Sequence, residues 1–173
     1  LADLNGDGAL DVALASVAPA VSGVLVFVND GRGGLTPRRL SNLPSPPVAL
    51  AAGDIDGDGD VDLVVEYSFC PYRLTAFLND GRGNFTQNSS GFGFNVNGWL
   101  PDLFDVERDG DLDLLVTSVY PTSNQLFINR GNGVFVNESS SRLPAGFIGQ
   151  PARPIDIDRD GWTDLVAGRT GML

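Results

Sequence analysis

The stretch Asp54-Ile-Asp56-Gly-Asp58-Gly-Asp60-Val-Asp62 decides how this chain folds. Its odd positions are all acidic, and glycine stands at the sixth position. Oxygens spaced in this way along a tight loop can converge on one point, which suits Ca²⁺, a cation that takes about six to eight oxygen ligands. The apolar residues that follow are typical of a strand with both faces covered. The stretch therefore predicts a metal-binding loop that leads into a buried strand.

The acidic stretch recurs at a fixed interval along the chain. Its copies begin at residues 3, 54, 105 and 156, so neighbouring copies lie 51 residues apart. A second motif, Phe-x-Asn-x-Gly-x-Gly, runs in step and begins at Phe27, Phe77 and Phe127. A proline lies between the two motifs, at Pro19, Pro71 and Pro121. Such a period indicates a repeat architecture in which each unit packs against its neighbours.

Each unit predicts four strands. An apolar strand precedes the acidic loop, as at Val48–Gly53, and a second strand follows the loop at Leu10–Val17, Val61–Glu66 and Leu112–Val119. The third strand is expected at Val24–Asn29, Leu74–Asn79 and Gln125–Asn129, and a short fourth strand near Leu35, Phe85 and Phe135. Gly and Asn of the second motif tolerate positive φ and predict a hairpin turn. Repeated four-stranded units are typical of β-propeller blades.

We therefore expect an all-β fold of β-propeller-type repeats, with blades of about 51 residues in three full units and a partial fourth. The units are approximately 1–47, 48–98, 99–150 and 151–173. The chain begins inside its first acidic loop, and a closed propeller needs about 4–8 blades. We expect a processed or partial chain that forms part of a larger propeller.

The two motifs together resemble the FG-GAP/VCBS repeats of integrin α-subunit head propellers, fungal lectin propellers and secreted adhesion proteins, and the VCBS type fits better. The resemblance covers essentially the whole chain. It implies that each loop joins the first two strands of a blade and binds Ca²⁺ structurally, about four ions in all. The implied side-chain ligands are Asp3, Asn5, Asp7 and Asp11; Asp54, Asp56, Asp58 and Asp62; Asp105, Glu107, Asp109 and Asp113; and Asp156, Asp158, Asp160 and Asp164. Backbone ligands are expected at Ala9, Asp60, Asp111 and Trp162.

The four loops differ in their expected affinity for calcium. Asn5 removes one charge from the first loop, which lowers its affinity somewhat. Glu107 stands where the other loops have Asp or Asn, and its extra methylene moves the oxygen outward, so the third loop is expected to be weakest. A helix–loop–helix calcium site is excluded, because it needs a Glu at the twelfth position, where this chain has Leu14, Val65, Val116 and Ala167. The remaining alternative is a set of solvated Asp-Gly turns without metal.

Composition excludes several functional classes. The net charge is −11 and the chain has no His. We expect no nucleic-acid partner, because phosphate binding needs clustered cations, and no membrane insertion, because no apolar run is long enough to span a bilayer. Catalysis by His is impossible and no nucleophile motif is present, so we expect no enzymatic activity. A glycosidase-type pair of acids among the loops is the alternative.

Other residues point to an extracellular protein. Glycosylation sequons occur at Asn84, Asn88 and Asn137. The lone Cys70 is either paired outside this segment or buried. Aromatic residues outside the repeat pattern, which can stack on sugar rings, are Tyr72, Phe92, Phe94 and Trp99. The segment 89–98 departs from its counterparts and is the expected place for specific recognition.

The leading functional prediction is a calcium-binding extracellular propeller module for adhesion to, or recognition of, a protein or glycan partner. One alternative is a structural, calcium-rigidified unit of an extracellular fibre, wall or appendage, built with other chains. A second alternative is a non-catalytic module of a secreted enzyme. A calcium-dependent glycan interaction would separate the first possibility from the structural one.

Overall fold

The computed structural model describes residues 1–18, 22–40, 43–67, 74–88, 100–118, 124–147 and 151–168. Within this part of the chain, thirteen strands and one short helix, α1 (Ser139–Arg142), make up the regular structure. The predicted all-β fold is confirmed. The residues Pro19, Cys70, Pro71, Tyr72 and Pro121 and the segment 89–99 lie outside the described residues.

The strands form four antiparallel sheets in chain order. Sheet one contains β1 (Val12–Ser16), β2 (Gly23–Asn29) and β3 (Leu35–Arg39). Sheet two contains β4 (Pro47–Gly53), β5 (Asp62–Tyr67), β6 (Leu74–Asn79) and β7 (Phe85–Asn88). Sheet three contains β8 (Leu100–Phe104), β9 (Asp113–Thr117), β10 (Gln125–Asn129) and β11 (Phe135–Asn137), and the last sheet contains β12 (Ala152–Ile155) and β13 (Asp164–Ala167).

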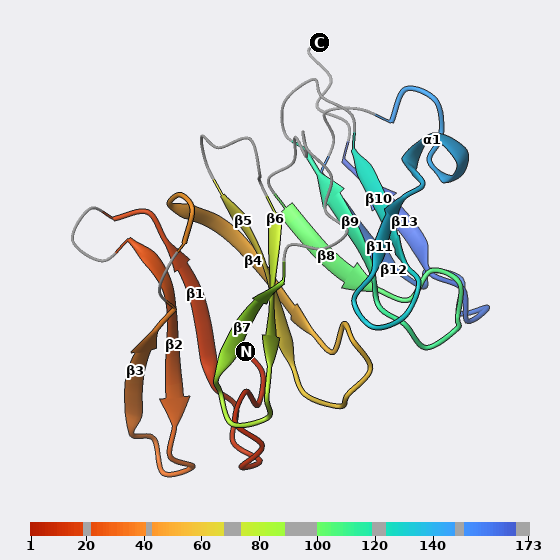
Figure 1. Ribbon diagram of the computed structural model, residues 1–173. Coiled ribbons are helices and arrows are strands. Elements are labelled where there is room, and N and C mark those ends of the chain that lie inside the picture. Colours follow the sequence, from red (N-terminus) through yellow and green to blue (C-terminus); the bar gives the residue numbers. More distant parts are fainter. Residues whose placement is uncertain are drawn as a thin grey trace.

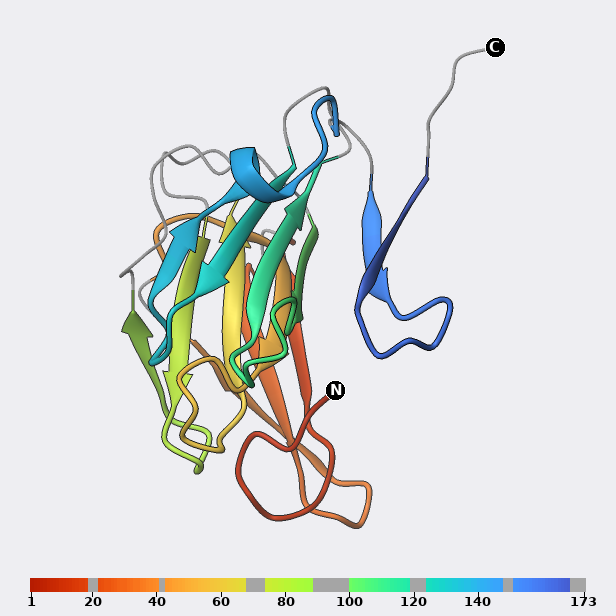
Figure 2. The same ribbon diagram turned by 90° about the vertical axis from the view of Figure 1, so that its right-hand side faces the viewer.

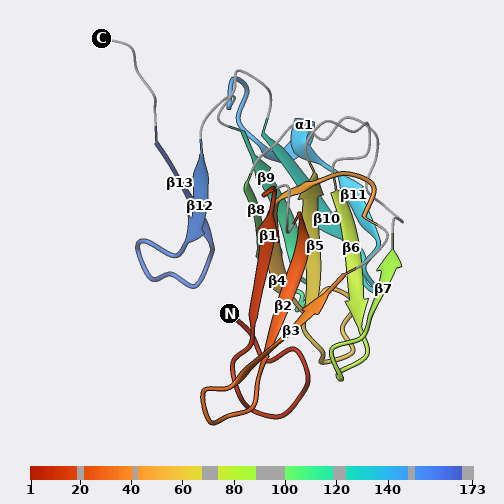
Figure 3. The same cartoon turned by 90° about the vertical axis from the view of Figure 1, so that its left-hand side faces the viewer.

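The sheets stand side by side like blades (Figure 1). The first strands of successive units are neighbours, because β4 lies against β8 and β8 lies against β12. The hairpin of β12 and β13 ends the row beside β8 (Figures 2 and 3). Propeller-type repeats with four-stranded blades are thus confirmed in sheets two and three, and the described strands do not close into a ring. The limits of the units stay a prediction.

The central strands are covered on both faces, as their apolar composition predicts. Leu63 and Val65 of β5 pack toward sheet one, whereas Val64 between them packs toward sheet three. All three side chains are fully buried. Because side chains of a strand alternate between its two faces, a continuous apolar run places one residue after another in alternate cores. The hydrophobic core therefore lies between the sheets rather than within any one of them.

The acidic loops lie at a common edge of the sheets because of this topology. In an antiparallel series of strands, alternate connections fall at the same end, so each acidic loop lies beside the hairpin turn that follows the third strand (Figure 1). Each loop is closed by one antiparallel pair, in the same register every 51 residues: Ala2 with Asp11, Gly53 with Asp62, Phe104 with Asp113, and Ile155 with Asp164.

Candidate metal centres

The first Asp of each loop organises the backbone around it. In loop two, Asp54 Oδ1 accepts the N–H of Gly57 at 2.8 Å and Oδ2 accepts the N–H of Gly59 at 2.9 Å. The bond from the sixth-position glycine recurs in every loop, at 2.8 to 3.0 Å to Asp3, Asp54, Asp105 and Asp156. These donors stabilise the carboxylate, and the N–H of Gly8 is the main reason that the pKa of Asp3 lies below its usual value. The loop is thereby wrapped around its first acid.

Two residues in each loop adopt positive φ, which the wrapping requires. In loop two they are Gly57 (79°) and Gly59 (92°). Loops three and four have Arg108 (60°) and Arg159 (64°) in the place of Gly57. A left-handed conformation costs a residue with a Cβ about 1–2 kcal/mol. The backbone conformation at the fourth position is therefore less favourable in loops three and four, where this residue is an arginine, than in loops with glycine there.

The ninth Asp ties the loop to the third strand of the same sheet. Asp62 Oδ2 accepts the N–H of Ile55 at 3.0 Å, and Oδ1 accepts the N–H of Asn79 at 2.7 Å. The same pair of bonds is made by Asp11 and Asp113. Asp62 is fully buried, and burial raises its pKa to about 6. The structure thus gives the ninth Asp a backbone-holding role, and its role as a metal ligand stays a prediction.

The asparagines that end the third strands of units two and three, Asn79 and Asn129, connect neighbouring sheets. Asn79 Nδ2 donates to Val61 O in its own unit at 3.0 Å and to Leu4 O in loop one at 2.9 Å. Asn129 Nδ2 does the same, reaching Ile55 O in loop two at 2.8 Å. We call these contacts the asparagine bridge. The sequence predicts these asparagines only as turn residues, and the signal for their role as a bridge is that they recur in step with the loops.

The second residue of the loop strengthens the same junction. Leu4 and Ile55 are each 1% exposed and pack in the cores between their own sheet and the next one. Burying such a side chain contributes about 1.5–3 kcal/mol. The equivalent Ile157 of loop four is 62% exposed. Loops one and two therefore hold the following sheet by both a backbone carbonyl and an apolar side chain.

Loop two gathers three carboxylates at one point. Oxygens of Asp54, Asp56 and Asp58 lie within 4.8 Å of one another. Asp56 Oδ1 is buried and has no hydrogen-bond partner. Burial, followed by the nearby charge of Asp58, raises the pKa of Asp56. A divalent cation would remove both penalties, and a set of oxygen donors suits a hard ion such as Ca²⁺. The residues of loop two therefore fit a calcium ion.

The other loops vary this arrangement. Loop four brings together oxygens of Asp156, Asp158 and Asp164, all exposed, within 4.8 Å. In loop one, Asn5 Nδ2 donates to Asp7 Oδ2 at 2.8 Å, which places the amide inside the loop. In loop three, both oxygens of the Glu107 carboxylate contact arginines.

The seventh residues keep one feature in common. The backbone N–H of each one donates to the fifth-position Asp of the same loop at 2.8 to 3.0 Å. These seventh residues are Ala9, Asp60, Asp111 and Trp162. This bond fixes the peptide that precedes the predicted carbonyl ligand. Their role as backbone metal ligands stays a prediction.

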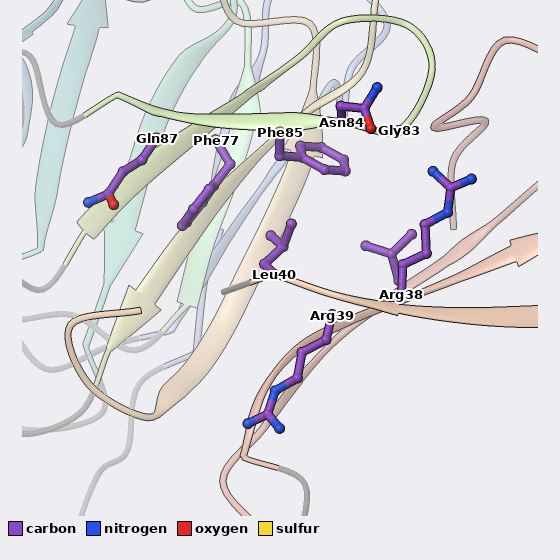
Figure 4. A pocket seen from close by; sticks show the side chains of 9 residues that line it. Arg38, Arg39, Leu40, Phe77, Gly83, Asn84, Phe85 and Gln87 are labelled. Atoms are coloured by element: carbon purple, nitrogen blue, oxygen red, sulfur yellow. The ribbon is translucent and has the colours of Figure 1, made fainter. Parts of the chain in front are cut away.

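A cleft of about 380 Å³ lies between sheets one and two. Arg38 and Arg39 at the end of β3, and Leu40 after them, line the side that lies opposite Phe77 and Phe85 (Figure 4). None of the described residues that line the cleft carries a carboxylate. In a chain with a net charge of −11, the two arginines make this hollow locally cationic, and Phe85 is its half-buried aromatic side chain.

The sequons differ in their surroundings. Asn84 and Asn137 are exposed, and Asn88 is half-buried. The Asn84 amide Nδ2, the atom that a glycan would modify, donates to Asp80 Oδ2 at 2.9 Å. Asn137 Oδ1 accepts the Ser139 hydroxyl at 2.6 Å, which leaves its amide nitrogen on the surface. Glycosylation at all three positions stays a prediction.

Comparisons with known proteins agree with the repeated loops. A family model described as FG-GAP-like repeat matches residues 3–65 and 105–167, well over half of the chain. The chain belongs to the FG-GAP-like repeat family. Each matched segment begins at the first acid of one loop and ends in the second strand of the next unit. The family match therefore follows the same register as the sheets.

Among solved structures, a chain of a mutant Tc holotoxin pore from Photorhabdus luminescens is similar, with a TM-score of 0.63 and 23% sequence identity. The likeness covers 99% of this chain and 8% of that chain, and it concerns the fold. No curated protein matches the chain. Within the described residues, no helix is long and apolar enough to cross a membrane.

Proposed function

We propose that this FG-GAP-like repeat region is a calcium-stabilised extracellular recognition module without enzymatic activity. The observation that carries the calcium assignment is the buried, unpaired Oδ1 of Asp56 beside Asp54 and Asp58. An ion held there would neutralise a cluster whose charges oppose folding. It would also fix Ile55, whose carbonyl and side chain both contact the next sheet.

Calcium binding can be tested together with its effect on stability. Bound metal is first removed with a chelator. Calorimetric titration with Ca²⁺ then measures binding, and thermal unfolding with and without Ca²⁺ measures the effect on stability. At a free Ca²⁺ concentration of 100 times the Kd, one site adds about 2.7 kcal/mol to the free energy of unfolding. We therefore expect calcium to raise the Tm, and we expect a smaller rise in Asp56→Ala. Absence of binding, or a Tm unchanged by calcium, would refute this proposal. Mg²⁺ is the control ion, because it prefers water to a full set of protein ligands.

We propose that, within the part of the chain that the structure describes, the cleft between sheets one and two contacts a partner. Its arginines, the half-buried ring of Phe85 and the exposed Gln87 offer charge, an apolar contact and hydrogen bonds to a glycan or to an acidic protein segment. A glycan array with and without calcium tests recognition. The variant Arg38→Ala/Arg39→Ala should lose binding, whereas Arg32→Ala, an exposed change in a hairpin turn, should keep it.

The structural role is the second candidate. The similar chain comes from a structure described as a holotoxin pore, and this supports a part built among other chains. The native mass of the particle, measured in calcium and in chelator, separates the two roles. A large assembly that dissociates on chelation supports the structural role, and a discrete particle of constant mass supports recognition.

A further inference from the structure

We infer that loop three is neutralised by arginines of its own unit and takes no calcium ion, in contrast to loop two. The inference rests on the proposed calcium binding of the other loops. It concerns a difference between units that share one register, and it follows from the surroundings of the third-position acid, which is Asp56 in loop two and Glu107 in loop three.

Both oxygens of Glu107 are already engaged with cations. Oε1 accepts from Arg142 Nη2 at 2.5 Å, and Oε2 accepts from Arg130 Nη1 at 3.4 Å. Asp56, the counterpart in loop two, has a buried oxygen without any partner. Arginine stays charged at every relevant pH and binds carboxylates with several fixed donors. The third-position acid is thus satisfied in loop three and unsatisfied in loop two.

The two arginines are themselves held in place. Glu138 contacts both of them: its Oε2 accepts from Arg142 Nε at 2.7 Å, and its Oε1 pairs with Arg130 Nη2. Arg142 is the principal cause that lowers the pKa of Glu138 below its usual value. Four charged groups therefore form a closed network in which Glu107 is one member. Charge networks with several contacts are better fixed than single surface pairs.

These cations are specific to the third unit. Arg130 follows Asn129 directly, and the residues at this place in units one and two are Asp30 and Asp80. There the acid accepts backbone N–H groups of its own hairpin turn instead of facing the loop. Arg142 comes from α1, which follows β11. In the third unit, the turn beside the acidic loop thus carries an arginine where units one and two carry an aspartate.

A third arginine adds to the local positive charge. Arg108 occupies the fourth position of loop three, and its guanidinium lies 5.1 Å from the ring centroid of Trp162 in loop four. A cation over an aromatic face is attracted to it. Loop three is thus linked to loop four by a side-chain contact that needs no metal.

Counting bound ions tests the inference. Native mass spectrometry gives the number of Ca²⁺ ions held by the wild-type chain and by Asp56→Ala and Glu107→Ala, variants matched in position. Asp56→Ala should hold one ion fewer than the wild type, and Glu107→Ala should hold the same number. The isosteric variant Glu107→Gln, which keeps the packing, should also leave the number unchanged.

The converse change should create a site. Glu107→Asp/Arg130→Asp/Arg142→Ala restores the acids of the other units, and we expect it to hold one ion more than the wild type. A wild type with four ions, or loss of an ion in Glu107→Gln, overturns the inference. A wild type that holds no ion refutes the proposed calcium binding instead, so the two failures are distinguishable.

Discussion

Loops two and three share a backbone plan and differ in what balances their charge. Both are wrapped around a first Asp, both are closed by a buried ninth Asp, and both face an asparagine at the end of a third strand. In loop two the third-position carboxylate is left with a buried free oxygen, whereas in loop three it meets arginines. We therefore expect the fold to depend on the ninth Asp and the asparagine, and the proposed calcium binding to depend on the third position.

Substitution of the ninth Asp should have the largest effect on stability, and it tests whether this residue has the same role in loops two and three. Asp62→Ala should lower the free energy of unfolding by about 2–6 kcal/mol, because two buried N–H groups lose their acceptor at about 1–3 kcal/mol each. Asp113→Ala should have an effect in the lower part of this range, because the Val106 N–H that it holds is only part-buried. Urea unfolding in excess chelator measures the loss without any contribution from calcium. The exposed fifth-position variants Asp58→Ala and Asp109→Ala are controls and should cost less than about 1 kcal/mol. A small effect at Asp62 or Asp113 would contradict a metal-independent role.

The asparagine bridge should have the next largest effect. Asn129→Asp keeps the shape of the side chain but turns an oxygen toward the carbonyls of Ile55 and Leu112. We expect a loss of about 2–4 kcal/mol, since a donor is replaced by a buried charge without a partner. Asn29→Asp is the matched control, because Asn29 donates to Leu10 O and is only half-buried. Equal losses in both variants, measured by urea unfolding, would show that contact between sheets adds nothing.

A smaller effect should appear in the pH dependence of the calcium-free protein. The pKa of Asp62 is about 6 in the folded state and about 3.9 in an unfolded chain. The folded state therefore keeps a proton that the unfolded state loses, and stability should fall as pH rises from about 4 to about 6, by at most about 3 kcal/mol. Burial also raises the pKa of Asp113, so loop three contributes with the same sign. Asp62→Asn should reduce the change of unfolding free energy with pH. An unchanged pH dependence would show that other groups cause it.

Much of the architecture follows from local sequence. The strands β6 and β10 match the predicted ranges, because a Gly-rich turn ends each one at its asparagine. The loops were recognised because their acids recur in one register. The pairing of Asn79 with Leu4, 75 residues away, was not predicted, since it depends on how two sheets meet. The network of Glu107 with Arg142 was missed for the same reason, although the outward displacement of a Glu side chain was foreseen.

The comparison of loops two and three is tested most directly by amide hydrogen exchange, measured with calcium and again with chelator. Peptides that cover residues 54–62 should lose protection when calcium is removed, and peptides that cover 105–113 should keep it, because arginines hold Glu107 under both conditions. Equal loss of protection in both loops would contradict the account, and so would a loop two that does not respond to calcium.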